Sequence, residues 1–191
     1  AEENVQEVIK IRKAKLGDDH ITMAAAYTNL ALVKFNRGAK DTTEVLPLLN
    51  RSKDIYQKTF GEKHPLYAEA LKNLAYYEIE KNNYDKAFEL LTKANDIWVL
   101  AFGERNVNSA RVAMLMGDLY AKLKKFKTAE ANYKQARKIY RKIFSEEHPE
   151  YVRALSKIGK IEFVRGRYSK ANKILAETTK QYLKYIGTYF P

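Results

Sequence analysis

Cysteine is absent from the 191 residues, which excludes disulfide bonds, thiolate nucleophiles and cysteine-bound zinc. Eight glycines and four prolines leave few chain breaks, and no stretch alternates apolar and polar residues as a strand does, so we expect an all-α fold. No apolar run approaches the roughly 18 residues of a membrane span, and the first residues do not resemble a secretory signal. These absences predict a soluble, cytoplasmic chain with no membrane partner.

Acidic residues are scarce in one part of the chain. Residues 1–121 hold 17 Lys and Arg against 17 Asp and Glu, whereas residues 122–191 hold 18 against 6. All of the net charge of +12 therefore lies in the last third, which favours acidic partners there.

One loop fragment occurs four times, beginning at Gly17, Gly61, Gly103 and Ser145, with spacings of 44, 42 and 42 residues. Apolar residues recur every three or four positions between the fragments, which predicts two helices per repeat. Small residues such as Gly117 and Gly159 at fixed points allow paired helices to approach closely. The expected helices, about nine in number, cover residues 3–16, 22–36, 45–60, 66–81, 84–102, 108–122, 126–144, 150–164 and 168–186.

The segments Asn73-Leu74-Ala75, Asn83-Tyr84-Asp85-Lys86-Ala87 and Gly61-Glu62-Lys63-His64-Pro65 resemble the tetratricopeptide repeat, in the 42-residue form found in kinesin light chains and many bacterial proteins. The resemblance implies a helical-hairpin solenoid that forms a superhelix. It divides the chain into a single array: the second helix of a cut repeat (1–16), four repeats (17–60, 61–102, 103–144 and 145–186) and the start of a further loop or exit segment (187–191).

The ending, residues 181–191, resembles the segment that leaves the repeats in bacterial proteins that continue into a CHAT caspase-like protease domain. We therefore expect the chain to be a fragment of a larger multidomain protein, whose protease chemistry would lie outside these residues.

Each first helix carries a second stripe beside its core stripe, and in tetratricopeptide arrays this stripe lines the concave groove that holds a peptide. Asparagine amides there can bind a peptide backbone, and apolar members are unexpected on a purely solvated face. The alternative for this stripe is a solvated helix face. The expected groove residues are Asn29, Leu32, Lys72, Asn73, Tyr76, Arg111, Met114, Leu115, Asp118, Arg153, Lys157 and Lys160.

No catalytic constellation is present in the sequence. His20, His64 and His148 occupy the same place in successive loops, so they should lie a repeat apart as structural loop residues and not form a metal site. The sequence thus predicts no enzyme, metal, cofactor or small-molecule substrate. It predicts a scaffold that binds a protein or peptide, with an acidic peptide favoured.

The alternative function is nucleic-acid or polyanion binding through the basic last third. Lysine outnumbers arginine there, and several of the charges follow one helix surface as ordinary solvation would. The residues concerned are Lys122, Lys124, Lys125, Lys127, Lys134, Arg137, Lys138, Arg141 and Lys142.

Overall fold

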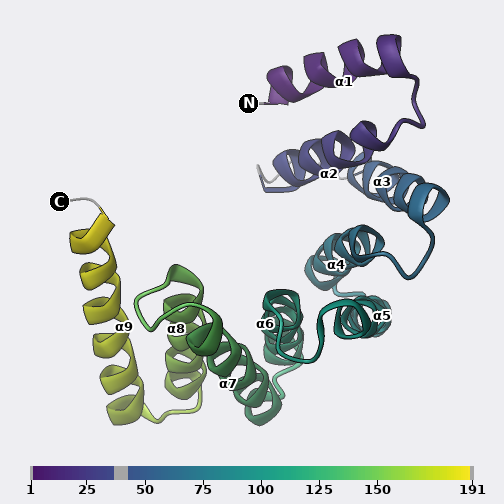
Figure 1. The fold of residues 1–191 in the computed structure, drawn as a ribbon. Helices are drawn as coiled ribbons and strands as arrows, with labels where there is room; N and C mark the ends of the chain where they lie inside the picture. Colours follow the sequence, from purple (N-terminus) through teal and green to yellow (C-terminus); the bar gives the residue numbers. More distant parts are fainter. Residues whose placement is uncertain (1, 37–42, 190–191) are drawn as a thin grey trace. The chain divides into compact units, whose positions relative to one another are not determined.

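The computed structural model describes residues 2–36 and 43–189, and this part of the chain consists of helices without any strand. Both ends of every expected helix are confirmed to within three residues, and the largest difference is at the end of the last helix. The nine helices of the described residues (Figure 1) are α1 (Glu2–Leu16), α2 (Ile21–Asn36), α3 (Val45–Phe60), α4 (Pro65–Glu80), α5 (Tyr84–Phe102), α6 (Val107–Lys122), α7 (Phe126–Ile143), α8 (Pro149–Val164) and α9 (Tyr168–Tyr189).

The chain divides into two compact units, residues 1–97 and residues 98–191, with the boundary inside α5. In the first unit α1 packs against α2, α2 against α3, and α3 against α4. In the second unit α6 packs against α7, α7 against α8, and α8 against α9. Within each unit, these helices that follow one another in sequence are thus neighbours in space, as in helical-hairpin arrays.

Each unit has its own apolar core. In the first unit Ala31, Val45, Leu49, Leu74 and Tyr77 form a buried cluster that joins α2, α3 and α4. In the second unit a larger cluster joins α6, α7 and α8, and it is built around the fully buried aromatic rings of Tyr133 and Tyr140.

Close helix approach at small residues is confirmed in the second unit. A Cβ atom at Gly117 of α6 would lie 2.3 Å from a ring carbon of Tyr133 in α7. A Cβ atom at Gly159 of α8 would lie 2.8 Å from the Leu175 side chain in α9. Both distances are below van der Waals contact. Glycine at position 117 therefore lets α6 pack against the Tyr133 ring as it does, whereas a side chain at position 159 would require the end of the Leu175 side chain to shift.

The repeated loops end and start helices as expected. Gly17, Gly61 and Gly103 follow helices at φ values of +83°, +81° and +78°, a region that favours glycine. Pro65 and Pro149 are the first residues of α4 and α8, where the missing N–H has no helical partner to lose. No helix in the described ranges combines the length and apolarity needed to cross a membrane.

Candidate peptide-binding surface

The expected groove residues of α2 lie beside an open hollow in the first unit. Asn29 is exposed and Leu32 is half-buried. Together with Val5 of α1 and with Val33 and Asn36 of α2, they line a hollow of about 520 Å³. Two amides on an otherwise aliphatic wall are suited to binding a peptide, because an amide can both donate to and accept from a peptide backbone.

Tyr76 of α4 is held in place by two residues at the end of α2. Its ring meets the Phe35 ring edge-on, with centroids 5.7 Å apart and planes at 87°. Its hydroxyl donates a hydrogen bond to Oδ1 of Asn36 over 3.5 Å. Asn36 lines the hollow together with Asn29 and Leu32, and it also accepts the hydrogen bond from Tyr76. These three expected residues therefore lie on one surface of the first unit. The stripe pattern did not include Asn36.

Two expected groove residues of α4 are less available. Asn73 is only 8% exposed, so the expectation of an accessible amide there is wrong. Lys72 is half-buried, and its ammonium group pairs with Glu69 one turn earlier. Both positions are covered because helices stacked in an array are packed on more than one side.

In the second unit the expected residues are mostly charged and paired. Lys157 Nζ of α8 lies 2.6 Å from Oδ1 of Asp118 in α6, and the buried Tyr133 hydroxyl donates to the same oxygen over 2.7 Å. Burial, followed by the charge of Asp118, raises the pKa of Tyr133. Lys157 and Asp118 therefore join α6 to α8 through an ion pair.

The remaining expected residues of the second unit divide by exposure. Arg111 and Arg153 are exposed, and each contacts a residue one turn earlier. Arg111 Nη1 donates to Oδ1 of Asn108 over 3.1 Å, and Arg153 Nη2 lies 2.6 Å from Oε2 of Glu150. Lys160 is exposed and Leu115 is half-buried. Met114 is 3% exposed within the core cluster, so its expected place on an accessible groove is wrong.

The three histidines directly precede the first residues of α2, α4 and α8. Nδ1 of His64 accepts the Leu66 N–H over 3.2 Å, and Nδ1 of His148 accepts the Glu150 N–H over 3.2 Å. Nδ1 of His20 likewise accepts the Thr22 N–H over 3.3 Å. Each ring supplies an acceptor that the helix start lacks, and their structural role is confirmed. No group of three His, Asp or Glu residues in the described part of the chain could hold a metal ion.

Sequence reasoning missed a buried ionic network at the end of α8 and the start of α9. Glu162 is fully buried, with its carboxylate 2.7 Å from Lys170 Nζ and 3.4 Å from Arg167 Nη1. Glu130 of α7 is 7% exposed and lies 2.6 Å from Arg165 Nη1. Burial by itself would raise the pKa of Glu130, but the hydrogen bonds of Lys134 and Glu162 and the charge of Lys134 outweigh it, so the pKa is lowered.

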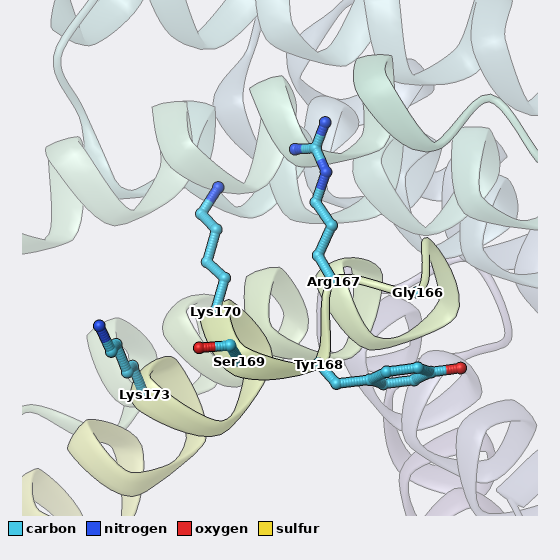
Figure 2. A pocket seen from close by; sticks show the side chains of 6 residues that line it. All are labelled: Gly166, Arg167, Tyr168, Ser169, Lys170 and Lys173. Atoms are coloured by element: carbon cyan, nitrogen blue, oxygen red, sulfur yellow. The ribbon is translucent and has the colours of Figure 1, made fainter.

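A signal for this network exists in the sequence. Glu78 occupies the same repeat position as Glu162, two repeats earlier, and it is also buried, with Lys86 Nζ at 2.6 Å and Asn83 Nδ2 at 2.6 Å. A glutamate that recurs at one repeat position on a helix, followed by a lysine eight residues later, therefore marks a buried carboxylate paired with a partly exposed lysine. In Figure 2 the Arg167 and Lys170 side chains extend in the same direction from the start of α9, whereas the Tyr168 ring points away from them.

Comparisons with solved structures support the fold. BtubC (BKLC) from P. vanneervenii is 16% identical, with a TM-score of 0.78 over 96% of this chain and 72% of that chain. The nearly identical TPR-like repeats of a Podosopora anserina protein described as a kinesin light chain are 19% identical, with a TM-score of 0.66 over 100% of this chain and 88% of that chain. The apo form of RapI is 21% identical, with a TM-score of 0.73 over 93% of this chain and 63% of that chain. At these identities the likeness establishes the fold alone.

No curated protein matches the chain. The family model described as Tetratricopeptide repeat matches residues 35–98 and 101–184, which is well over half of the sequence. These two segments contain α3, α4, α6, α7 and α8 and most of α5 and α9. The chain therefore belongs to the tetratricopeptide repeat family.

Proposed function

We propose that this chain is a non-catalytic protein-interaction scaffold whose first helices bind a peptide or a neighbouring domain. The observation that carries the proposal is the hollow in the first unit, where the exposed amide of Asn29 lies among Val5, Leu32 and Val33. Apolar walls supply affinity through burial, and the amides of Asn29 and Asn36 supply backbone hydrogen bonds. Membership of the repeat family supports a scaffold in general terms.

The second unit extends the proposal to acidic segments. Arg111, Arg153 and Lys160 are exposed on the first helices α6 and α8. Glu150 pairs with Arg153 and Asp118 pairs with Lys157, so these carboxylates face two of the four cations that the expected groove has in the second unit. A peptide with carboxylates at one end is the ligand whose charge complements this surface.

The experiment starts from a 12-residue random peptide library displayed on phage and selected on the full chain. Selected peptides are then synthesised, and their dissociation constants are measured by fluorescence anisotropy. The double variant Asn29→Ala, Leu32→Ala should weaken binding about tenfold or more, since it removes a backbone hydrogen bond and buried aliphatic area. The matched control is Glu89→Ala, Thr92→Ala on the exposed part of α5, which should leave binding unchanged.

The acidic preference has a separate test. Selected peptides should be enriched in Asp and Glu, and Arg153→Ala, Lys160→Ala should weaken their binding most at low salt. Selected peptides that bind the Asn29→Ala, Leu32→Ala variant as tightly as the natural chain would refute the proposed surface. Equal binding by acidic and neutral peptides would refute the charge preference and leave the surface in place.

A further inference from the structure

Two helix corners of the second unit are strongly basic. The α6–α7 corner is residues 122–127 and the α8–α9 corner is residues 165–173, and neither segment contains an Asp or a Glu. We call their cations the basic edge: Lys122, Lys124, Lys125, Lys127, Arg165, Arg167, Lys170 and Lys173.

The buried network brings the two corners together. Arg165 Nη1 lies 2.6 Å from Oε2 of Glu130, which is in the second turn of α7, and Lys170 Nζ lies 3.7 Å from the other oxygen of Glu130. The α8–α9 corner therefore lies against the start of α7, which directly follows Lys124 and Lys125. Glu130 and Glu162 are the two carboxylates among these contacts, and the cations of the basic edge that face them are Arg165, Arg167 and Lys170.

The repeat fold requires only part of this charge. The equivalent α4–α5 corner of the first unit has Asn83 where the basic edge has Lys125 and Arg167. It has Asp85 in place of Lys127 and Glu89 in place of Lys173. Lys81 and Lys86 match Arg165 and Lys170, so the corners differ in charge at the positions of Lys125, Lys127, Arg167 and Lys173, and a binding role accounts for the added charge there.

The backbone of Lys124 gives a second and independent indication. Its φ is +58°, a left-handed conformation that side chains with a Cβ atom disfavour. The equivalent residues are Asn82 at +64° and Gly166 at +75°, the two residue types that tolerate this region best. A lysine at this position therefore has a conformational cost. We attribute its presence to the positive charge that it exposes at the corner.

Exposed aromatic rings lie at the α8–α9 corner, where the Tyr168 ring points away from Arg167 and Lys170 (Figure 2). Tyr168 is 59% exposed and Phe163 is 56% exposed, and their rings are in edge contact with centroids 5.3 Å apart. The residue equivalent to Phe163 in the first unit is Ile79, which is buried. Tyr168 also lines an open hollow of about 550 Å³ together with Arg167, Lys170 and Lys173 (Figure 2).

We propose that the basic edge binds single-stranded nucleic acid, with phosphates on its lysines and arginines and a base stacked on Tyr168. Cations along a backbone path combined with exposed ring faces are the two elements by which proteins bind single strands without sequence preference. A duplex offers no free base faces to Tyr168, and an acidic peptide needs no ring. This inference concerns a different surface from the proposed peptide site, so either can fail without the other.

The test uses the 191-residue chain and a fluorescein-labelled 12-nucleotide deoxythymidine strand, with anisotropy measured at several salt concentrations. Binding should weaken log-linearly with salt, by a slope of about 0.7 for each phosphate contacted. Lys127→Ala, Lys173→Ala should reduce that slope by about 1.4 if each lysine contacts one phosphate. Tyr168→Ala should weaken binding about tenfold with little change of slope, because it removes stacking and not charge.

Lys124→Gly is the most discriminating variant. It removes a charge and relieves the left-handed backbone, so it should weaken strand binding while raising the melting temperature, which separates a binding defect from misfolding. The matched control for the Lys127→Ala, Lys173→Ala variant is Lys10→Ala, Lys15→Ala in exposed positions of α1, which removes the same two charges from the first unit and should leave binding within twofold.

Three results would overturn the proposal. One is the absence of strand binding at 50 mM salt. Another is tighter binding of a duplex of the same length. The third is binding of a 12-residue polyglutamate as tight as that of the strand and unaffected by Tyr168→Ala, which would identify the basic edge as a docking surface for acidic protein segments.

Discussion

The His148 imidazole stacks on the Phe144 ring, with centroids 3.8 Å apart and planes 9° apart, while its Nδ1 accepts the Glu150 N–H at the start of α8. His64 repeats the arrangement at α4, where it stacks on Phe60 at 4.2 Å and accepts the Leu66 N–H. In the repeat between them Asn106 takes this place and accepts the Ser109 N–H over 2.9 Å. A stacked phenylalanine–histidine pair thus caps the starts of α4 and α8, and an asparagine amide caps the start of α6.

His148→Ala should lower the free energy of unfolding by about 1 kcal/mol, the usual effect of losing a helix-capping acceptor. His148→Asn should lose less, because an asparagine side chain can accept the same N–H, as Asn106 does. Urea denaturation of the two variants and the natural chain provides the comparison. Equal losses would show that ring stacking on Phe144, and not the cap, makes the main contribution.

Gly117→Ala should destabilise the second unit by about 1–3 kcal/mol, because its Cβ atom would lie 2.3 Å from the Tyr133 ring and would push α6 from α7. Gly187→Ala is the matched control, since no atom lies within 4 Å of the added Cβ and alanine favours the helix by about 0.5–1 kcal/mol. Thermal unfolding should therefore shift in opposite directions for the two variants. An unchanged melting temperature for Gly117→Ala would mean that Tyr133 can move without cost.

The helices were predictable from the sequence because their ends are encoded locally. A glycine after α1, α3 and α5 and a proline or a capping side chain at the start of α4, α6 and α8 are visible without coordinates, and both act within a few residues. The end of α9 lacks such a signal: the helix continues through Gly187 to Tyr189, beyond the end expected at residue 186.

The site was predictable only in part, because burial depends on which helices pack together. Met114 and Asn73 belong to the same stripe as Asn29, yet Met114 and Asn73 are buried and Asn29 is exposed. The spacing of residues along one helix does not reveal which of them the neighbouring repeat buries. The division of the chain within α5 was not foreseen, and the expected continuation into a CHAT protease domain stays a prediction.

The acid stability of the first unit should depend on Asp18. The hydrogen bond from Tyr27, followed by those from Lys13 and Arg51, outweighs burial and lowers the pKa of Asp18. A lowered pKa contributes stability above the ordinary aspartate value of 3.8, and that stability is lost as pH falls through the lower, folded value. Because the side chain is about one-third exposed, the contribution should stay below about 1 kcal/mol.

The measurement is the melting temperature of Asp18→Asn and of the natural chain between pH 7 and pH 2. The difference should be present at pH 7 and should disappear at the acid end, whereas Asp96→Asn, at an exposed position, should show no such trend. A difference that persists at pH 2 would contradict the proposed role of the Asp18 charge.

The hydrogen-bond partner Tyr27 acts at alkaline pH. Burial, followed by Asp18, raises the pKa of Tyr27 to about 12, so the stability that this raised pKa contributes is complete below pH 10 and is lost as pH rises from 10 to 12.

Glu162→Gln should lower the free energy of unfolding by about 1–3 kcal/mol, the range for a buried group that loses charged hydrogen-bond partners. Glutamine keeps the shape of the side chain, so the change isolates the negative charge that faces Lys170 and Arg167. Both of these cations are about half exposed and can regain water, which keeps the loss below that of a fully buried ion pair. Glu104→Gln, in an exposed loop, controls for the change of net charge and should be neutral within about 0.5 kcal/mol in urea denaturation. A loss equally small for Glu162→Gln would mean that the α8–α9 corner is held by its apolar contacts and not by the buried carboxylate.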